Sequence, residues 1–160
     1  MRATIKVAIP TIQEMNSMSE MPNMLKEIST LYRKTQMYLE ENLKPLSLSK
    51  GQATFIMCIC DHKVLTQNKL GEMLDMDKST VAKTLARMEQ QGYITRSTNS
   101  DDSRSLNVRP TEKAWSIYPK TRAIGDQWCE EITKDLTGIE KDIFYQLMQR
   151  TGLNATRYFE

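Results

Sequence analysis

The sequence lacks the features that mark several large classes of protein. No apolar run in its 160 residues approaches the roughly 18 residues that a membrane-spanning helix needs. Lys6 interrupts the only short apolar stretch at the N-terminus, so we expect no signal peptide, no membrane partner and a cytoplasmic location. Three cysteines, an odd number, argue against a disulfide scaffold.

Residue patterns typical of enzymes are also scarce. The chain has one histidine, His62, and no phosphate-binding loop, metal-ligand spacing or pattern that pairs a nucleophile with a base. We expect His62 to end a buried helix, where a basic group meets the negative end of the helix dipole. The sequence therefore predicts neither an enzyme nor a protein with a metal or other cofactor.

Charge of one sign is not in large excess either. The net charge is +2, which is weak evidence for a polyanionic partner, so charge has to be judged on individual helix faces. Aromatic residues make up only 7% of the chain, whereas methionine, which fills irregular cores, occurs 11 times. A single chain of this length can bury a core without disulfides or metals.

The most specific pattern runs from Asp77 to Gly92. Asp77 predicts the N-cap of a helix, and Gly92 the residue in the left-handed conformation that follows its end. At about 100° per residue, Val81, Leu85 and Met88 share one face, which predicts that this face is buried.

The opposite face of this predicted helix is basic and carries hydroxyl groups. It consists of Ser79, Lys83, Arg87 and Gln90, with Thr80 and Thr84 beside them. Such a face suits phosphates and base edges. Lys83 and Arg87 lie one turn apart and can each bond a guanine, while hydroxyls in the first helical turn suit phosphates.

The neighbouring segments complete a winged helix-turn-helix pattern. Thr66 is expected to cap a short helix, Gln67–Leu74, that precedes the Asp77 helix. After Gly92 we expect two strands, Tyr93–Arg96 and one containing Leu106 and Val108, around a polar tip that forms the wing.

Longer helices are predicted on both sides of this segment. The first runs from about Pro22 to Leu43, and a capping box at Ser49 opens a second, which is apolar on all sides and so expected to be central. A third runs from Thr111 to about Leu136, and a last one follows Gly138. Residues 1–20 form a leader, read either as a disordered segment or as a short strand.

The wing tip carries Asp102 and Arg104. One interpretation is that Asp102 orients the Arg104 guanidinium for entry into a narrow minor groove, and the other is an ordinary solvated turn. The predicted DNA-contacting residues are Thr66, Lys78, Ser79, Thr80, Lys83, Thr84, Arg87 and Arg104, with Asp102 in support. A winged helix that binds protein instead of double-stranded DNA is the alternative.

The order and spacing of these residues resemble a known family. The matching residues are Leu70–Leu74, Ser79–Val81, Leu85, Met88–Ile94, Asp102–Arg104 and Thr111–Lys113. They are similar to the MarR family of bacterial winged-helix regulators, firmly from Ser49 to Ala114. The chain departs from the family at Pro110, where leucine is usual, and at Ala114, where glycine is usual. Pro110 lacks an N–H and is expected to end the second strand early.

The resemblance implies a mainly α fold: a winged helix-turn-helix lobe over about residues 49–110, with a two-stranded wing. N- and C-terminal dimerisation helices, about residues 22–43 and 111–158, would complete a single domain over residues 21–160. It further implies a homodimer that reads a pseudo-palindromic operator as a repressor, or less often as an activator.

The resemblance also implies release from DNA by a small molecule or by oxidation. A small aromatic or phenolic effector could contact Trp115 and Tyr118, although both residues also suit a core position. Cys58 and Cys60 raise a thiol-based redox alternative, but they point about 200° apart on one helix in an apolar segment, which favours packing. Cys129 could approach its counterpart in a dimer.

Overall fold

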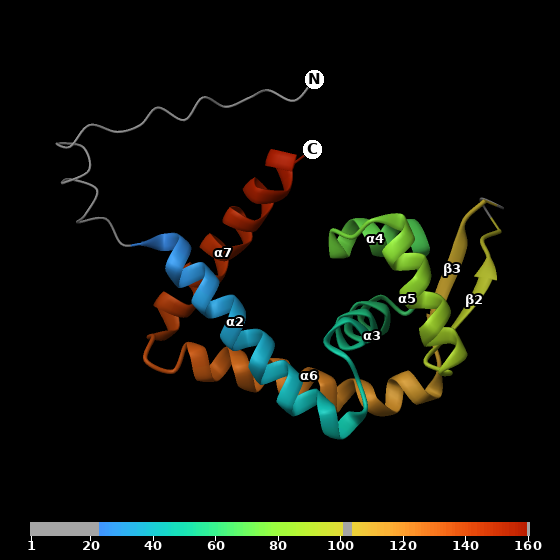
Figure 1. Ribbon diagram of the computed structural model, residues 1–160, viewed down its shortest axis with the longest axis horizontal. Helices are drawn as coiled ribbons and strands as arrows, with labels where there is room; N and C mark the ends of the chain where they lie inside the picture. The colour runs from blue at the N-terminus through green and yellow to red at the C-terminus, as the bar shows by residue number, and fades with distance from the viewer. Residues whose placement is uncertain (1–22, 101–103, 160) are drawn as a thin grey trace. The chain divides into compact units, whose positions relative to one another are not determined.

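The computed structural model describes residues 23–100 and 104–159, so the predicted leader and Asp102 lie outside the described residues. Its elements are α2 (Met24–Leu43), η1 (Lys44–Leu46), α3 (Lys50–His62), β1 (Leu65–Thr66), α4 (Gln67–Leu74), α5 (Lys78–Gln90), β2 (Ile94–Thr98), β3 (Leu106–Pro110), α6 (Glu112–Ile132) and α7 (Gly138–Phe159). Figure 1 shows this mainly helical arrangement.

The chain divides within α2 into two compact units, residues 1–35 and 36–160. The second unit holds the last turns of α2 and all later elements. Within it, the ring of Tyr38 stacks on that of Trp128 in α6, with centroids 4.6 Å apart.

The core of the second unit is built around α3. The side chains of Phe55, Ile56 and Ile59 are fully buried, and α3 contacts α5, α6 and β3. Ser49 caps the helix as predicted: its hydroxyl accepts from the N–H of Gln52, whose side chain in turn accepts from the N–H of Ser49. The expectation of a central apolar helix is confirmed.

The helix-turn-helix consists of α4 and α5, which are in contact. A Cβ atom on Gly71 would lie 3.3 Å from the carbonyl oxygen of Met76 and 3.4 Å from a methyl group of Val81. Glycine therefore permits the close approach of α4 to the turn and to the first part of α5. As predicted, Val81, Leu85 and Met88 are buried.

The sheet has three antiparallel strands in the order β1-β3-β2, one more than the predicted two-stranded wing. The additional strand, Leu65–Thr66, pairs with Val108 and Asn107 of β3. The β2–β3 hairpin runs from the pair Ile94–Pro110 to the pair Thr98–Leu106.

Two sequence expectations about this hairpin are wrong. The first strand begins at Ile94 and extends to Thr98 instead of covering Tyr93–Arg96. Pro110 does not end the second strand early, because it is the last residue of β3 and faces Ile94 in the register. Proline is tolerated at this position because the strand ends here and no further ladder bond is required of it.

A hydrogen-bonded junction joins the end of α5 to the start of α6. Gly92 has a φ of 76°, the left-handed conformation expected after the helix end. The hydroxyl of Thr111 donates to the carbonyl oxygen of Gly92 at 2.7 Å, and the N–H of Thr111 donates to that of Tyr93 at 3.0 Å. The Lys113 ammonium donates to the carbonyl oxygen of Gln91 at 2.7 Å and lies 4.3 Å from the centre of the Tyr93 ring.

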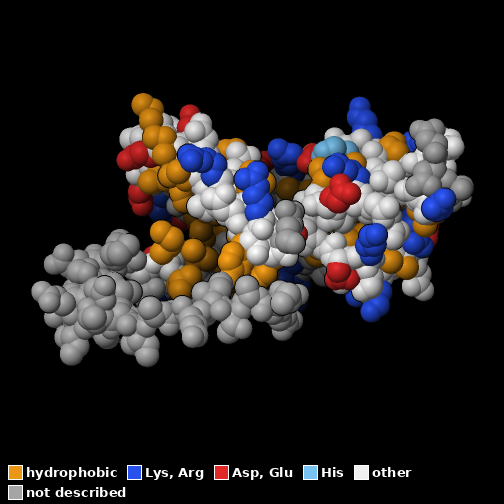
Figure 2. Space-filling model, turned by 90° about the horizontal axis from the view of Figure 1, so that it is seen from above, with side chains coloured by type: hydrophobic (Ala, Val, Ile, Leu, Met, Phe, Trp, Pro, Cys, Tyr) orange, Lys and Arg blue, Asp and Glu red, His pale blue; other side chains and the backbone are white. Residues whose placement is uncertain are grey.

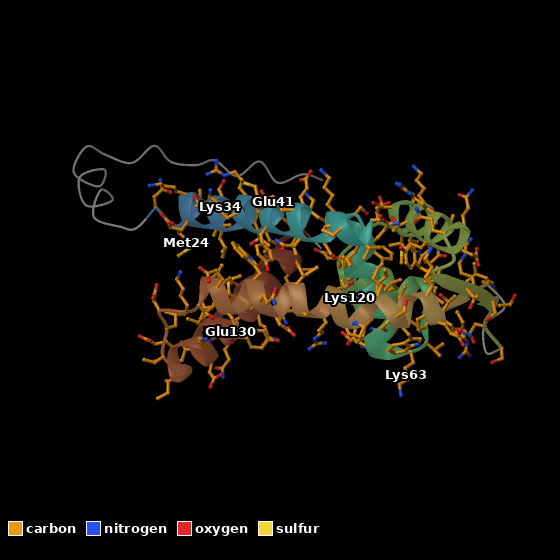
Figure 3. The ribbon with its side chains drawn as sticks, turned by 90° about the horizontal axis from the view of Figure 1, so that it is seen from below. Met24, Lys34, Glu41, Lys63, Lys120 and Glu130 are labelled. Carbon is orange, nitrogen blue, oxygen red and sulfur yellow. The ribbon has the colours of Figure 1, made fainter. Side chains whose placement is uncertain are left out.

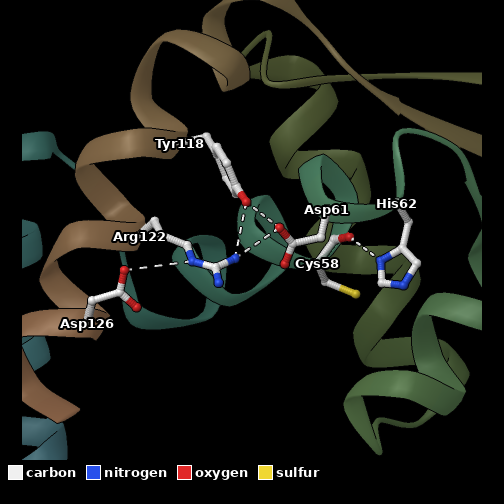
Figure 4. A network of polar contacts seen from close by, with 6 residues as sticks. All are labelled: Cys58, Asp61, His62, Tyr118, Arg122 and Asp126. Carbon is white, nitrogen blue, oxygen red and sulfur yellow. Dashed lines mark hydrogen bonds and ion pairs between the residues drawn. The ribbon is translucent and has the colours of Figure 1, made fainter.

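A polar cluster ties α3 to α6 (Figure 4). The hydroxyl of Tyr118 donates to the Asp61 carboxylate, and the Arg122 guanidinium lies 3.3 Å from both. Arg122 also forms an ion pair with Asp126 at 3.9 Å. At the end of α3, Nδ1 of His62 is 2.9 Å from the carbonyl oxygen of Cys58, in agreement with the predicted position of His62 at the helix terminus.

The last two helices differ in length from the prediction. α6 ends at Ile132 and not near Leu136, because Thr133 leaves the helical conformation with its N–H bonded to the carbonyl oxygen of Glu130. Thr137 and Glu140 form a reciprocal cap at the start of α7. Gly138 is therefore the first residue of α7, whereas the sequence placed the helix after it.

Among the residues that the structure describes, few contacts cover α7. None of its described side chains is buried, and Ile139 is 74% exposed. Its other exposed large hydrophobic residues are Ile143, Tyr145, Leu147, Met148, Leu153, Tyr158 and Phe159. Figure 2 shows hydrophobic side chains at the surface of this part of the molecule, among Lys, Arg, Asp and Glu. This apolar surface is available to a partner.

Candidate nucleic-acid interface

The basic face of α5 is exposed as the sequence predicted. Lys78, Lys83 and Arg87 are all exposed, on a helix whose other face is anchored in the core. Lys83 and Arg87 are four residues apart, about 6 Å along the helix axis. Thr84 is half-buried, so it lies at the edge of the face rather than on it.

The first turn of α5 differs from the expectation that its hydroxyls are directed at a ligand. Both hydroxyls donate to the carboxylate of Asp77, that of Ser79 at 2.7 Å and that of Thr80 at 2.6 Å. The N–H groups of both residues donate to the same carboxylate at 3.0 and 2.9 Å. The hydroxyl and N–H of Thr80, followed by those of Ser79, hold the pKa of Asp77 well below its usual range. The carboxylate is therefore charged, and the two hydroxyl oxygens keep only their acceptor capacity.

Thr66 is half-buried and acts as the N-cap of α4. Its hydroxyl accepts from the N–H of Lys69 at 3.2 Å, and its backbone is part of the pairing between β1 and β3. The structure thus gives Thr66 a local role in addition to its predicted role in binding. The neighbouring Lys69 is exposed and forms an ion pair with Glu72 at 3.1 Å.

The wing carries Arg104 at the end of the hairpin, and this residue is exposed. Asp102, its predicted partner, lies outside the described residues, so the Asp102–Arg104 pair remains a prediction. Arg109, which sequence reasoning did not select, is an exposed cation on β3 and faces Thr95 in the register.

An open cavity of about 820 Å³ lies at the C-terminal end of α5. It is lined by the last turns of α2, by η1, by the start of α3, and by Arg87 and Gln91. Trp115 and Tyr118, the aromatic residues suggested for an effector cleft, do not line it, and Trp115 is 40% exposed. Arg87 therefore touches both the exposed face of α5 and this cavity.

The thiol groups of Cys58 and Cys60 are poorly suited to redox sensing. Burial, and then the nearby Asp61 carboxylate, raises the pKa of Cys60 to about 11 and also raises the pKa of Cys58. A thiol with a raised pKa carries little of the reactive thiolate at neutral pH. Cys129, in contrast, is exposed on α6.

Sequence reasoning missed an ion pair between α5 and the wing. Arg96 in β2 binds Glu89 in the last turn of α5 through its guanidinium and its N–H. The available sequence signal was an acid and a base seven residues apart around Gly92. This spacing indicates a contact between Glu89 and Arg96 only once the turn at Gly92 is known to fold β2 back along α5.

Among residues 23–100 and 104–159, no group of three or more metal-ligating side chains comes together. No helix formed by these residues has the length and apolarity needed to cross a bilayer.

Comparison with known proteins identifies the family. A family model described as "MarR family" matches residues 48–106. The transcriptional regulator HosA of Escherichia coli O111:H- is 33% identical over 103 residues, which cover 64% of this chain and 76% of HosA. The chain belongs to the MarR family. It is thus a transcriptional regulator and not an enzyme.

Other known proteins match more of the chain. The HTH-type transcriptional regulator YybA of Bacillus subtilis, described as uncharacterized, is 29% identical over 140 residues, covering 88% of this chain and 93% of YybA. The structure of a MarR protein from Peptoclostridium difficile has a TM-score of 0.79 and 26% identity, and covers 98% of this chain and 97% of that one. A variant of Escherichia coli MarR complexed with operator DNA has a TM-score of 0.71, covering 89% of this chain and 99% of that one, and at 22% identity it supports the fold alone.

Proposed function

We propose that the chain is a homodimeric repressor that binds a pseudo-palindromic operator, with α5 in the major groove and the wing at the adjacent minor groove. The observation that carries the proposal is the two-sided character of α5: Val81, Leu85 and Met88 are buried, and Lys83 and Arg87 are exposed opposite them. A major groove about 12 Å wide admits such a helix. In this proposal residues 21–160 form one domain, with the lobe at about 49–110.

The test begins with selection of bound duplexes from a random library by the purified protein. Lys83→Ala and Arg87→Ala are expected to weaken binding to the selected site by roughly 1–3 kcal/mol each and to relax sequence preference. Lys120→Ala, which removes an exposed lysine from α6 (Figure 3), serves as the matched control and should bind as the wild type does. Equal affinity of all four proteins would contradict the proposal, as would affinity that does not change with salt.

The exposed apolar surface of α7 supports the homodimer. Ile143 and Leu147 lie one turn apart and are 51% and 50% exposed in the single chain. Leaving such side chains in water forgoes the free energy of burying them, so a second copy of the chain is the simplest partner. Leu147→Glu should shift the protein from dimer to monomer in analytical ultracentrifugation, while Gln149→Glu, a polar change on the same helix, should not. A monomeric wild type would contradict this part of the proposal.

The cavity beside Arg87 supports regulation by a small molecule. Its volume falls within the usual range for ligand sites, roughly 300–1,000 Å³, and its wall carries Lys44, Lys50 and Arg87 beside Glu40 and Glu41. Lys50 pairs with Glu40 at 3.3 Å, so Lys44 and Arg87 are the cations that we assign to a carboxylate. A phenolic acid bound there would compete with DNA for Arg87 and so release the operator. Salicylate is the probe: it should lower operator affinity of the wild type but have less effect on Lys44→Ala. Equal release from both proteins would place the effector elsewhere.

A further inference from the structure

We propose that the ion pair between Glu89 and Arg96 is a positioning element that fixes the wing against α5 and thereby sets the minor-groove contact. Neither residue was expected to touch DNA, and the inference concerns how the protein holds two DNA-contacting parts at one fixed angle. It rests on the proposed function, since it assumes that α5 and the wing bind the same duplex.

Three hydrogen bonds join Glu89 to Arg96. One carboxylate oxygen of Glu89 accepts from the N–H of Arg96 at 3.0 Å. The other accepts from Nε at 2.9 Å and from Nη2 at 2.6 Å. The two side chains are only 37% and 22% exposed. Charge-assisted bonds that engage a guanidinium through two nitrogens fix orientation as well as distance.

The backbone bond ties the strand itself, and not only a side chain, to the helix. β2 lies at the edge of the sheet, where alternate N–H groups have no strand to bond to. Glu89 satisfies one of these groups, at Arg96, in the middle of the strand. Arg96 faces Val108 of β3, which is fully buried, so the position held by Glu89 is also the position where the hairpin meets the core.

The two ends of the hairpin are held differently. At its base, the turn at Gly92 and the bonds from Thr111 fix the strands to the start of α6. The far end, which carries Arg104, extends beyond the pair Thr98–Leu106. The ion pair at Arg96 lies between the fixed base of the hairpin and the end that carries Arg104. A change in the angle between the hairpin and α5 therefore moves Arg104 relative to α5. α5 itself is fixed independently by its buried face, so loss of the ion pair should displace the wing and leave the major-groove face intact.

The experiment compares protection of the two grooves on the selected site by wild type, Glu89→Ala and Glu89→Gln. Dimethyl sulfate reports guanine N7 in the major groove, and hydroxyl radical reports the minor groove. Glu89→Ala should lose minor-groove protection flanking each half-site, keep the guanine protection, and bind about tenfold more weakly with a shallower salt dependence. Glu89→Gln keeps an acceptor for the Arg96 N–H and should be intermediate. Glu131→Ala, which breaks an exposed ion pair with Lys134 at 2.7 Å, is the matched control and should protect both grooves as the wild type does.

Three results would overturn the inference. Full protection of both grooves by Glu89→Ala would show that the pair does not position the wing. If Glu89→Gln lost protection of both grooves to the same degree and also had a lower Tm, the pair would be a general stabilising contact and not a positioning element. Absence of any protection by the wild type would overturn the proposed function first, and this inference with it, so the two failures are distinguishable.

Discussion

The side-chain amide of Gln52 donates a hydrogen bond to the side-chain carbonyl of Gln91, and so joins the first turn of α3 to the residue that ends α5. Gln52 is buried, and its carbonyl oxygen also accepts from the N–H of Ser49. One amide thus serves a helix cap and a contact between two helices.

Gln52→Ala is therefore expected to lower the free energy of unfolding by about 1–3 kcal/mol, because buried polar partners are left unsatisfied. Urea unfolding followed by circular dichroism measures the change. Gln90→Ala, which removes an exposed glutamine near the same helix end, should change stability by less than about 0.5 kcal/mol. Equal effects of the two substitutions would contradict the structural role of Gln52.

Gly92 and Gly51 should respond oppositely to alanine. Gly92 has a φ of 76°, a conformation that costs an L-residue about 1–2 kcal/mol, so Gly92→Ala should destabilise by that amount. Gly51 lies in the first turn of α3 with open space around the position of a Cβ atom, so Gly51→Ala should leave stability unchanged or raise it by up to about 1 kcal/mol. Thermal unfolding of both variants gives the sign of each change in stability. A Gly92→Ala variant that is more stable than the wild type would contradict the turn geometry.

The N-cap Asp77 predicts a specific pH dependence. Hydrogen bonds from Thr80 and Ser79 lower the pKa of Asp77 below its ordinary value of 3.8. A carboxyl group whose pKa is lower in the folded than in the unfolded protein stabilises the fold above its unfolded pKa, and this contribution is lost as the pH falls below it. Asp77→Asn keeps a capping oxygen but does not titrate.

The Tm difference between wild type and Asp77→Asn should thus be largest near neutral pH and should shrink as the pH falls below about 4. Thermal scans at a series of pH values, at constant ionic strength, provide the measurement. A difference that stays constant through this range would mean that the Asp77 carboxylate is not held by the first turn of α5.

Much of the fold could be predicted because helix faces and caps are local patterns. The buried stripe of Val81, Leu85 and Met88, the cap at Ser49 and the left-handed Gly92 all follow from spacing within a few residues. The strand Leu65–Thr66 could not be predicted, because two residues carry no periodicity and their pairing with β3 joins segments over 40 residues apart.

Other parts of the site depend on contacts that spacing does not encode. The sequence predicted that α6 continues to about Leu136, but the chain leaves the helical conformation at Thr133. The exposed face of α5 was predictable as a surface, whereas the use of its first hydroxyls by Asp77 was not, because capping and ligand binding favour the same residue types. The Glu89–Arg96 pair could not be predicted from spacing, because the contact depends on how the turn at Gly92 directs β2 back along α5.

The most direct test of the central claim, that the Lys83–Arg87 face of α5 reads duplex DNA, is guanine N7 methylation protection on a site selected by the wild-type protein. The account predicts two protected patches about one helical turn apart, both lost when Lys83 and Arg87 are replaced together by alanine and both kept in Lys120→Ala. Protection that survives in the double variant, at the same guanines and the same protein concentration, would contradict it.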